Sequence, residues 1–221
     1  MAYTKTLSTQ GYQHPIPAAD AGARRPGRTS KTQLKLFRAA LEIMSKKGPT
    51  ATTVEEVALK AGVSKGTVYY NFGSKKTMVE QLLQYGAKLL RDQIQRGAQG
   101  ADPRLALRGA IRAAFDYLRI HPGFARLWIA EVWKDRETWS ETLIEIRQDL
   151  VAEIERMVRA ISYKYRVDLS QEPAAIAVAI FGATFMLSMD HEIHAAQRSS
   201  EEATRAVMLL VDSYIQPEAA L

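Results

Sequence analysis

Residues 53–76 read TVEEVALKAGVSKGTVYYNFGSKK, and this stretch predicts two short helices joined by a glycine turn. Thr53 is suited to cap the first helix, because a threonine oxygen accepts a hydrogen bond from an N–H of the first turn. Gly62 follows that helix where a left-handed backbone is needed, which glycine adopts without strain. Ser64 is suited to cap the second helix, residues 65–72. The pattern indicates a helix-turn-helix, whose second helix is shaped to enter the major groove of DNA.

The second of these helices has two distinct faces. Val68 and Phe72 form its apolar side, which we expect to be buried. Its other side presents groups that suit contacts with bases and phosphates: Lys65, Thr67, Tyr69 and Asn71. Helix–glycine–helix corners are also common in all-α proteins, so a corner with no DNA role is the alternative at this point.

The distribution of charge favours nucleic acid as the partner. From Arg24 to Arg91 there are 14 Lys and Arg against 4 Asp and Glu, a net charge of +10. The whole chain has 30 and 24, so the remainder has 16 and 20, a net charge of −4. A positive segment attached to a mildly negative body is typical of phosphate binding.

The same residues resemble the TetR family of bacterial transcriptional regulators. The pattern T-x-x-x-V-A-x-x-A-G-V-S-K-G-T-x-Y-x-x-F-x-S-K is kept, and it covers roughly the first third of the chain. Asn71 departs from it, because many members carry histidine there. The resemblance implies a palindromic double-stranded operator as the partner. The residues expected to contact it are Arg28, Thr53, Ser64, Lys65, Gly66, Thr67, Tyr69, Tyr70, Asn71 and Lys75.

Helical periodicity and helix-capping residues continue along the rest of the chain, and no useful β-alternation appears. We therefore predict an all-α fold in three parts. Residues 1–28 form a flexible basic arm, residues 29–76 a three-helix DNA-binding domain, and residues 77–221 a helical domain. The helix from 74 to 96 connects the last two. Further helices are expected at 32–47, from 103, from 122, at 137–163, at 173–194 and from 200, with Gly48–Pro49 ending the first.

Large aromatic side chains are concentrated in the second part. Aromatic residues at helical spacing are usually plain core, which is the alternative for each of them. The resemblance implies an enclosed, mostly apolar pocket for a small apolar or aromatic effector. The candidate lining residues are Phe115, Trp128, Trp133, Trp139, Ile146, Phe181 and Phe185.

Small residues recur on one side of the alanine-rich helix that follows Pro173. Such residues let helix backbones approach closely, and the resemblance implies a four-helix interface with a second copy. A homodimer also follows from the DNA reading, since one recognition helix contacts too few base pairs to be selective. The candidate interface residues are Ala175, Ala179, Gly182, Ala183, Val207, Leu210, Val211 and Tyr214. The alternative is that this face packs only within one chain.

Several other classes are disfavoured. The chain has no cysteine, which excludes a disulfide framework and a thiol catalyst, and no nucleophile or phosphate-loop motif, so we expect no enzyme and no cofactor. The cluster Asp190, His191, Glu192 and His194 lacks the spacing of a zinc motif, so no metal is expected. The apolar run 174–189 is shorter than the ~20 residues of a membrane span. We expect a cytoplasmic protein.

These observations predict a ligand-responsive regulator, a repressor that leaves its operator when a small molecule enters the body. An effector-independent DNA-binding protein, in which the helical body only dimerises, is the alternative. The ligand, the operator, the regulated genes, the choice between repression and activation and any role of the basic arm do not follow from the sequence.

Overall fold

Helices make up the regular structure of residues 28–190 and 198–216, which are the residues that the computed structural model describes; within them there is one isolated bridge, between Val167 and Ile215. The side chains of residues 28–30 and 136 are not described. The all-α prediction is confirmed. The elements are α1 (Arg28–Ala51), α2 (Val54–Ala61), α3 (Lys65–Phe72), α4 (Lys75–Gly97), α5 (Pro103–Ile120), α6 (Pro122–Val132), the 3-10 turn η1 (Arg136–Thr138), α7 (Glu141–Lys164), α8 (Pro173–Asp190) and α9 (Ser200–Tyr214).

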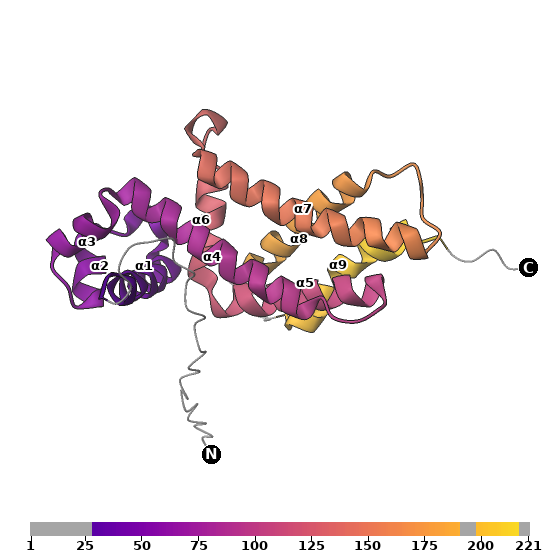
Figure 1. Cartoon of the computed structure of the whole chain (residues 1–221), viewed down its shortest axis with the longest axis horizontal. Helices are drawn as coiled ribbons and strands as arrows, with labels where there is room; N and C mark the ends of the chain where they lie inside the picture. Colours follow the sequence, from indigo (N-terminus) through magenta and orange to yellow (C-terminus); the bar gives the residue numbers. More distant parts are fainter. Residues whose placement is uncertain (1–27, 191–197, 217–221) are drawn as a thin grey trace, which may run out of the picture.

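The helices fall into two groups along the length of the molecule (Figure 1). Helices α1, α2 and α3 lie together at one end, and we call them the head. Helices α5 to α9 form the body. Helix α4 starts in the head and continues along the body.

Local chemistry sets most of the helix boundaries. The side-chain oxygens of Ser64, Ser74, Asp102 and Ser199 each accept a hydrogen bond from the backbone N–H three residues later. These caps satisfy donors that have no partner within the helix. Gly48 (φ 82°) interrupts α1, so the helix proper ends where predicted, and one more turn follows through Ala51.

The start of α7 differs from the prediction. We expected a helix from residue 137, but Ser140 caps α7, with its hydroxyl accepting from Leu143 N (3.3 Å), and η1 precedes it. The Trp139 side chain donates from Nε1 to the carbonyl of Lys134 (3.0 Å), which holds the preceding segment as a closed loop. The apolar spacing predicted Trp139 as part of the helix, but this residue lies in the loop before it.

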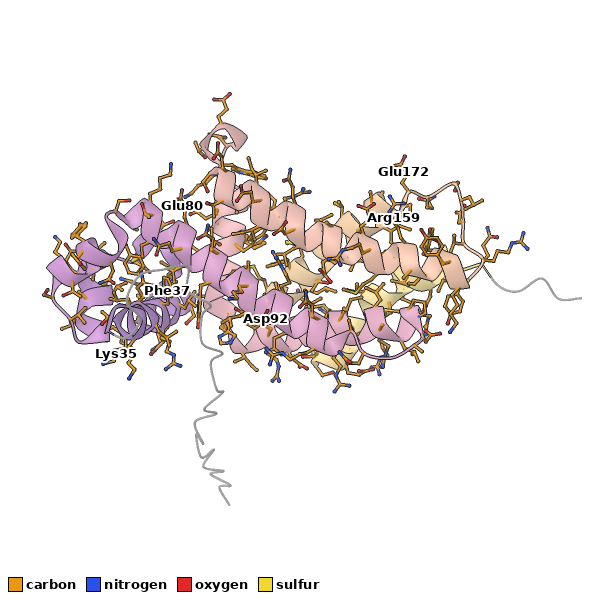
Figure 2. The ribbon with its side chains drawn as sticks, in the orientation of Figure 1. Lys35, Phe37, Glu80, Asp92, Arg159 and Glu172 are labelled. Atoms are coloured by element: carbon orange, nitrogen blue, oxygen red, sulfur yellow. The ribbon has the colours of Figure 1, made fainter. Side chains whose placement is uncertain are left out.

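Aromatic packing joins the head to the connecting helix. The Phe37 ring lies 5.5 Å from that of Phe72 in α3 and stacks 5.1 Å from that of Tyr85 in α4. Figure 2 shows Phe37 on the side of α1 that faces α4, with Lys35 on the outer side. One ring of α1 therefore contacts both the second helix of the helix-turn-helix and the helix that leaves the head.

Helix α6 is wedged against both α1 and α4. A Cβ at Gly123 would lie 2.2 Å from the carbonyl oxygen of Leu41, so the two backbones are in direct contact. A Cβ at Gly86 in α4 would lie 2.2 Å from the ring of Phe124. Tyr117 of α5, whose ring lies 5.9 Å from that of Phe124, donates its hydroxyl to the Gly86 carbonyl (2.9 Å). Glycine at two positions thus lets α6 fill the junction between head and body.

The far end of the body depends on close approach and ion pairs. Helices α4 and α5 touch where a Cβ at Gly109 would lie 2.2 Å from the Gly97 carbonyl oxygen. The guanidinium of Arg104 in α5 binds both oxygens of Asp212 in α9, at 2.7 and 3.0 Å. Two oxygens and two N–H groups in this arrangement also fix the relative orientation of the helices.

We predict that Gly123→Ala lowers the free energy of unfolding by about 1–3 kcal/mol, because the added methyl group overpacks a contact between two backbones that cannot both stay in place. Gly66→Ala is the control, since a Cβ there meets only Ser64 Oγ at 3.7 Å. That variant should be neutral or more stable by about 0.5–1 kcal/mol. Urea unfolding of the full chain measures both, and equal stabilities would contradict the tight α1–α6 contact.

Candidate nucleic-acid interface

The corner between α2 and α3 is built as the sequence predicts. Thr53 Oγ1 accepts from Glu56 N (3.3 Å), and the Glu56 carboxylate accepts from Thr53 N (2.9 Å), which completes a capping box. Gly62 is left-handed (φ 66°, ψ 39°). Ser64 Oγ accepts from Thr67 N (3.1 Å) and starts α3. Thr53 and Ser64, both expected at the DNA, therefore also hold the two helices in shape.

Helix α3 has a buried face and an exposed one, as predicted. Val68 and Phe72 are buried against the rest of the head. Tyr69 is 44% exposed and Tyr70 is 86% exposed, although both are large rings. Gly66 on the exposed side leaves bare backbone, and nothing in the packing of the chain requires a glycine there. This surface admits close approach by another molecule.

Lys65 begins the exposed face and already has a partner. Its ammonium forms an ion pair with the carboxylate of Glu55 in α2 and lies 5.8 Å from the centre of the Tyr69 ring. The hydrogen bond from Lys65 keeps the pKa of the Glu55 carboxyl below its usual value, so the pair is fully charged at neutral pH. Glu55 was not among the residues predicted for this surface. Its position in the first turn of α2 was visible, but its distance from Lys65 depends on the angle between the helices.

Two further predicted contact residues are oriented by backbone groups. Asn71 Nδ2 donates to the carbonyl of Thr67 (2.7 Å), which points the amide along α3, and Asn71 Oδ1 is buried without a hydrogen-bond partner among the described residues. Lys75, the first residue of α4, donates to the carbonyl of Thr50 (3.3 Å). Arg28 starts α1, but its side chain lies outside the described residues, as do Arg24 and Arg25 of the basic arm.

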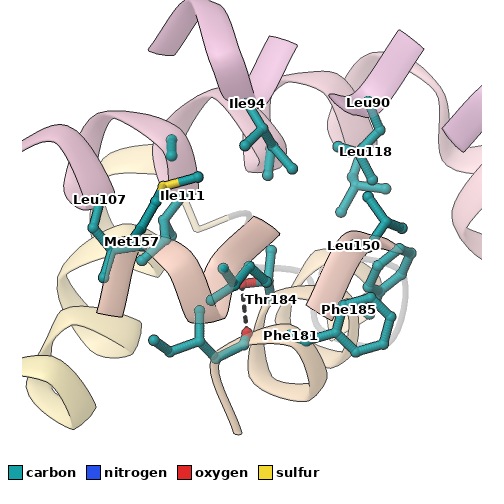
Figure 3. Close-up of a pocket in the computed structure, with 14 residues that line it drawn as sticks. Leu90, Ile94, Leu107, Ile111, Leu118, Leu150, Met157, Phe181, Thr184 and Phe185 are labelled. Atoms are coloured by element: carbon teal, nitrogen blue, oxygen red, sulfur yellow. Dashed lines mark hydrogen bonds between the residues drawn. The ribbon is translucent and has the colours of Figure 1, made fainter. Parts of the chain in front are cut away.

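The body contains a cavity of about 30 Å³ between α4, α5, α7 and α8. Figure 3 shows apolar side chains turned toward it from both sides. Sequence reasoning found two of the lining residues, Phe181 and Phe185, and missed aliphatic ones, among them Leu90, Ile94, Leu107, Ile111, Leu118 and Leu150.

The other five residues predicted for the pocket do not line this cavity. Phe115 and Ile146 are buried in the core, and Trp128 stacks behind Phe185 with ring centres 5.4 Å apart. Trp133 is 75% exposed, and Trp139 is held in the loop before α7. The role of all five in ligand binding stays a prediction, because an apolar side chain indicates burial, as for Phe115, Ile146 and Trp128, but not which space it borders.

The predicted interface residues separate into two sets. Ala175 and Ala179 are exposed on α8, Gly182 and Ala183 are half-buried, and a Cβ at Gly182 would meet nothing within 4 Å. Leu210 on α9 is also exposed. In contrast, Val207, Val211 and Tyr214 are buried within the chain. These three do not form a surface that a second copy would meet, because the inward face of α9 packs on the body; Ala206 and Leu209 occupy the outward face instead.

The acidic and histidine cluster that begins at Asp190 lies mostly outside the described residues. Asp190 forms an ion pair with Arg198, while His191, Glu192 and His194 lie outside the described residues.

Among the described residues one helix, α8, is apolar and long enough to pass as a membrane span by length and composition, with a mean hydropathy of 1.6. Only 22% of that window is buried, so α8 is a packing helix on one face and an exposed apolar helix on the other.

A short helix with a cationic and aromatic outer face, joined to its neighbour by a left-handed glycine, defines the class of helix-turn-helix proteins of the DNA-binding type. Residues 36–82 match the family model described as "Bacterial regulatory proteins, tetR family". The predicted resemblance to the TetR family of transcriptional regulators is thereby confirmed for residues 36–82.

Individual relatives agree with the family. The chain is 29% identical over 100 residues to the HTH-type transcriptional regulator YerO of Bacillus subtilis, which is 44% of this chain and 35% of that one. It is 26% identical over 161 residues to the HTH-type transcriptional repressor KstR2 of Rhodococcus jostii, 70% of this chain and 76% of that one. The chain thus spans about a third of the length of one relative and three quarters of the other.

Solved structures show the same fold over most of the chain. The fatty acid degradation regulator FadR from Bacillus halodurans superposes with a TM-score of 0.71 at 16% identity, and the match covers 85% of this chain and 96% of that one. At this identity the likeness concerns the fold alone.

We predict that Glu55→Gln increases affinity for any DNA duplex, because it releases Lys65 from its ion pair and removes a negative charge from the surface that is expected to meet DNA. If Lys65 then binds one more phosphate, the plot of log affinity against log salt concentration should steepen by ~0.9. Fluorescence anisotropy with a duplex of arbitrary sequence measures both quantities.

Glu42→Gln is the matched control for this prediction. Glu42 lies on α1 and pairs with Lys60 (2.7 Å) and Lys46 (3.4 Å), so the variant makes the same change of charge away from the exposed face of α3. Identical behaviour of the two variants would mean that Glu55 acts only through net charge.

Proposed function

We propose that this protein is a repressor that binds a near-palindromic operator as a homodimer in the cytoplasm and is released by a small, largely apolar ligand. The observation that carries the proposal is the exposed face of α3, where Lys65, Tyr69 and Tyr70 stand clear of the packed head. The relative KstR2 is named a transcriptional repressor, which supports this direction of control. The proposal assigns residues 1–28 to an arm, 29–76 to DNA binding and 77–221 to ligand binding and dimerisation.

Two kinds of contact with the operator follow from the placement of the side chains. Residues expected to contact phosphates and fix the register of the protein are Arg28, Lys65 and Lys75, with Tyr69, Tyr70 and Thr53. Residues on the outward side of α3 would lie nearest the bases, namely Lys65, Gly66, Thr67, Tyr69 and Asn71. Lys75 stands at the N-terminus of α4, where free N–H groups also favour a phosphate.

The exposed faces of α8 and α9 support a dimer. Ala175, Val178, Ala179, Gly182 and Met186 recur at intervals of three and four along α8 and share one outward side. Ala206, Leu209 and Leu210 present an apolar side of α9. A second copy related by a two-fold axis would cover both faces in one four-helix contact, and it would place two α3 helices on one side of the DNA.

Release by a ligand would act through α4. Leu90 and Ile94 of this helix line the cavity, while its N-terminus follows directly after α3. A ligand that fits the cavity better in one arrangement of α4 would shift the dimer toward the spacing of the two heads that goes with it. The shift can be no larger than the difference in ligand affinity between the two arrangements.

The second candidate is a DNA-binding protein without an effector. The small size of the cavity favours it, since about 30 Å³ holds only a few water molecules. The two candidates differ in one measurement, because operator affinity should respond to a bound compound only in the first. Fragments of the source genome captured by the purified protein would supply the operator for that titration.

We predict that Tyr69→Ala and Lys65→Ala each weaken operator binding by about 1–3 kcal/mol, the value of a good base contact. Tyr163→Ala is the control, because that ring is 88% exposed on the body. Electrophoretic mobility shift titrations with the captured operator give the affinities. Unchanged binding in both head variants would support a purely structural corner.

We also predict that Leu209→Arg converts the dimer to a monomer, because it places a charge in the centre of the proposed apolar contact between copies. Leu169→Arg is the control, as Leu169 is 91% exposed outside α8 and α9. Sedimentation equilibrium reports the mass of each variant. A wild-type protein that sediments as a monomer would remove the basis for a two-fold operator.

A further inference from the structure

The residues that line the cavity extend along the body. The lining on α5 runs from Leu107 to Leu118, eleven residues of helix or ~16 Å. Met157 lines the cavity as well and is a side chain that adapts readily to a neighbour, so the cavity can widen around a bound chain.

The walls of the cavity offer almost nothing to a polar group. Thr184 supplies the only side-chain heteroatom that hydrogen-bonds strongly, and its hydroxyl already donates to the carbonyl of Ile180 (2.8 Å). A buried polar group without a partner costs free energy, so a ligand with polar atoms along its length is disfavoured. An apolar lining that extends along α5 fits an unbranched hydrocarbon chain better than a compact flat aromatic compound.

A charged pair lies beside the lining residues on α4 and α7. Arg91 follows the lining residue Leu90 on α4, and Asp149 precedes the lining residue Leu150 on α7. Their side chains are 35% and 58% exposed, so the pair lies at the surface next to residues that line the cavity. The Arg91 guanidinium donates from Nη2 to Asp149 Oδ2 (2.7 Å) across the seam between the two helices. Arg91 Nε is buried and has no hydrogen-bond partner among the described residues.

We propose that the effector is a linear hydrocarbon chain with an anionic headgroup, whose chain occupies the cavity and whose headgroup binds Arg91 at the α4–α7 seam. The unpaired Nε and the neighbouring Nη2 suit an anion with two oxygens, which Asp149 engages through one oxygen only. The ligand's anion replaces Asp149 as the partner of Arg91. This inference rests on the proposed function only for the consequence of binding, because the ligand class is tested by binding itself.

Three compounds separate the parts of this proposal in isothermal titration calorimetry with the full chain. Decanoate has the chain and the anion, decanol has the chain alone, and naphthoate has the anion on a flat aromatic body. We expect decanoate to bind more tightly than decanol, and naphthoate to bind weakest. Naphthoate binding more tightly than decanoate would overturn the chain, and equal affinities for decanoate and decanol would overturn the role of Arg91.

Substitutions of the two residues at the α4–α7 seam should change the affinity for decanoate in opposite directions. Arg91→Gln should abolish the preference for decanoate over decanol. Asp149→Asn removes the carboxylate that competes for Arg91, so it should tighten decanoate binding by about two- to fivefold, the effect of one partly exposed ion pair, and leave decanol unchanged. Glu145→Gln, which removes an exposed carboxylate one turn earlier on α7, is the control and should change neither affinity. A tightening equal to that of Asp149→Asn in the control would overturn the assignment.

A cavity-filling substitution tests the location of the chain. Ala114→Leu places a larger side chain in the cavity, and it should abolish decanoate binding while the affinity for duplex DNA stays unchanged. Ala110→Leu, on the same lining, serves if the first variant does not fold. Undiminished decanoate binding in a folded variant would overturn the location.

The failure of this inference is distinguishable from failure of the proposed function. Decanoate that binds as described without changing operator affinity would contradict release by a ligand and leave the ligand class standing. An operator affinity that responds to another compound, with no alkyl chain bound, would overturn the ligand class alone.

Discussion

The contact of α6 with its two neighbours is the constraint on which the arrangement of the molecule depends. Gly123 brings the α6 backbone against the carbonyl of Leu41, and Phe124, the next residue, fills the space that Gly86 leaves open in α4. Because both contacts are made by one turn of one helix, α1 and α4 cannot move independently near this point. The head is therefore attached to the body through a packed corner as well as through the continuous helix α4.

This packed corner fixes one point of α4 between the cavity and the head. Leu90 and Ile94, which border the cavity, lie one and two turns beyond Gly86 on α4. The hydroxyl of Tyr117 holds the Gly86 carbonyl in a buried site, and burial raises the pKa of that phenol, so the hydrogen bond persists across the physiological pH range. Under the proposed function, a displacement of α4 at the cavity would be passed to the head around a point fixed by α5 and α6.

Sequence reasoning succeeded where the cause is local. The caps at Thr53 and Ser64 and the left-handed Gly62 were predicted because each depends on a few neighbouring residues. It failed where the cause is the angle between helices. Val207 faces the body and Leu210 faces outward, and this difference depends on how α9 packs on the body. The ion pair of Glu55 with Lys65 likewise joins two helices. The cavity is lined mainly by aliphatic residues from four helices, and no spacing within one helix marks them.

The small residues on the outward face of α8 have a consequence for how two copies would meet. Alanine and glycine have no side-chain rotamers to lose, so covering Ala175, Ala179 and Gly182 costs little conformational entropy. Under the proposed function, a contact between copies that is built on these small residues would permit a small rotation, which would change how far apart the two heads stand.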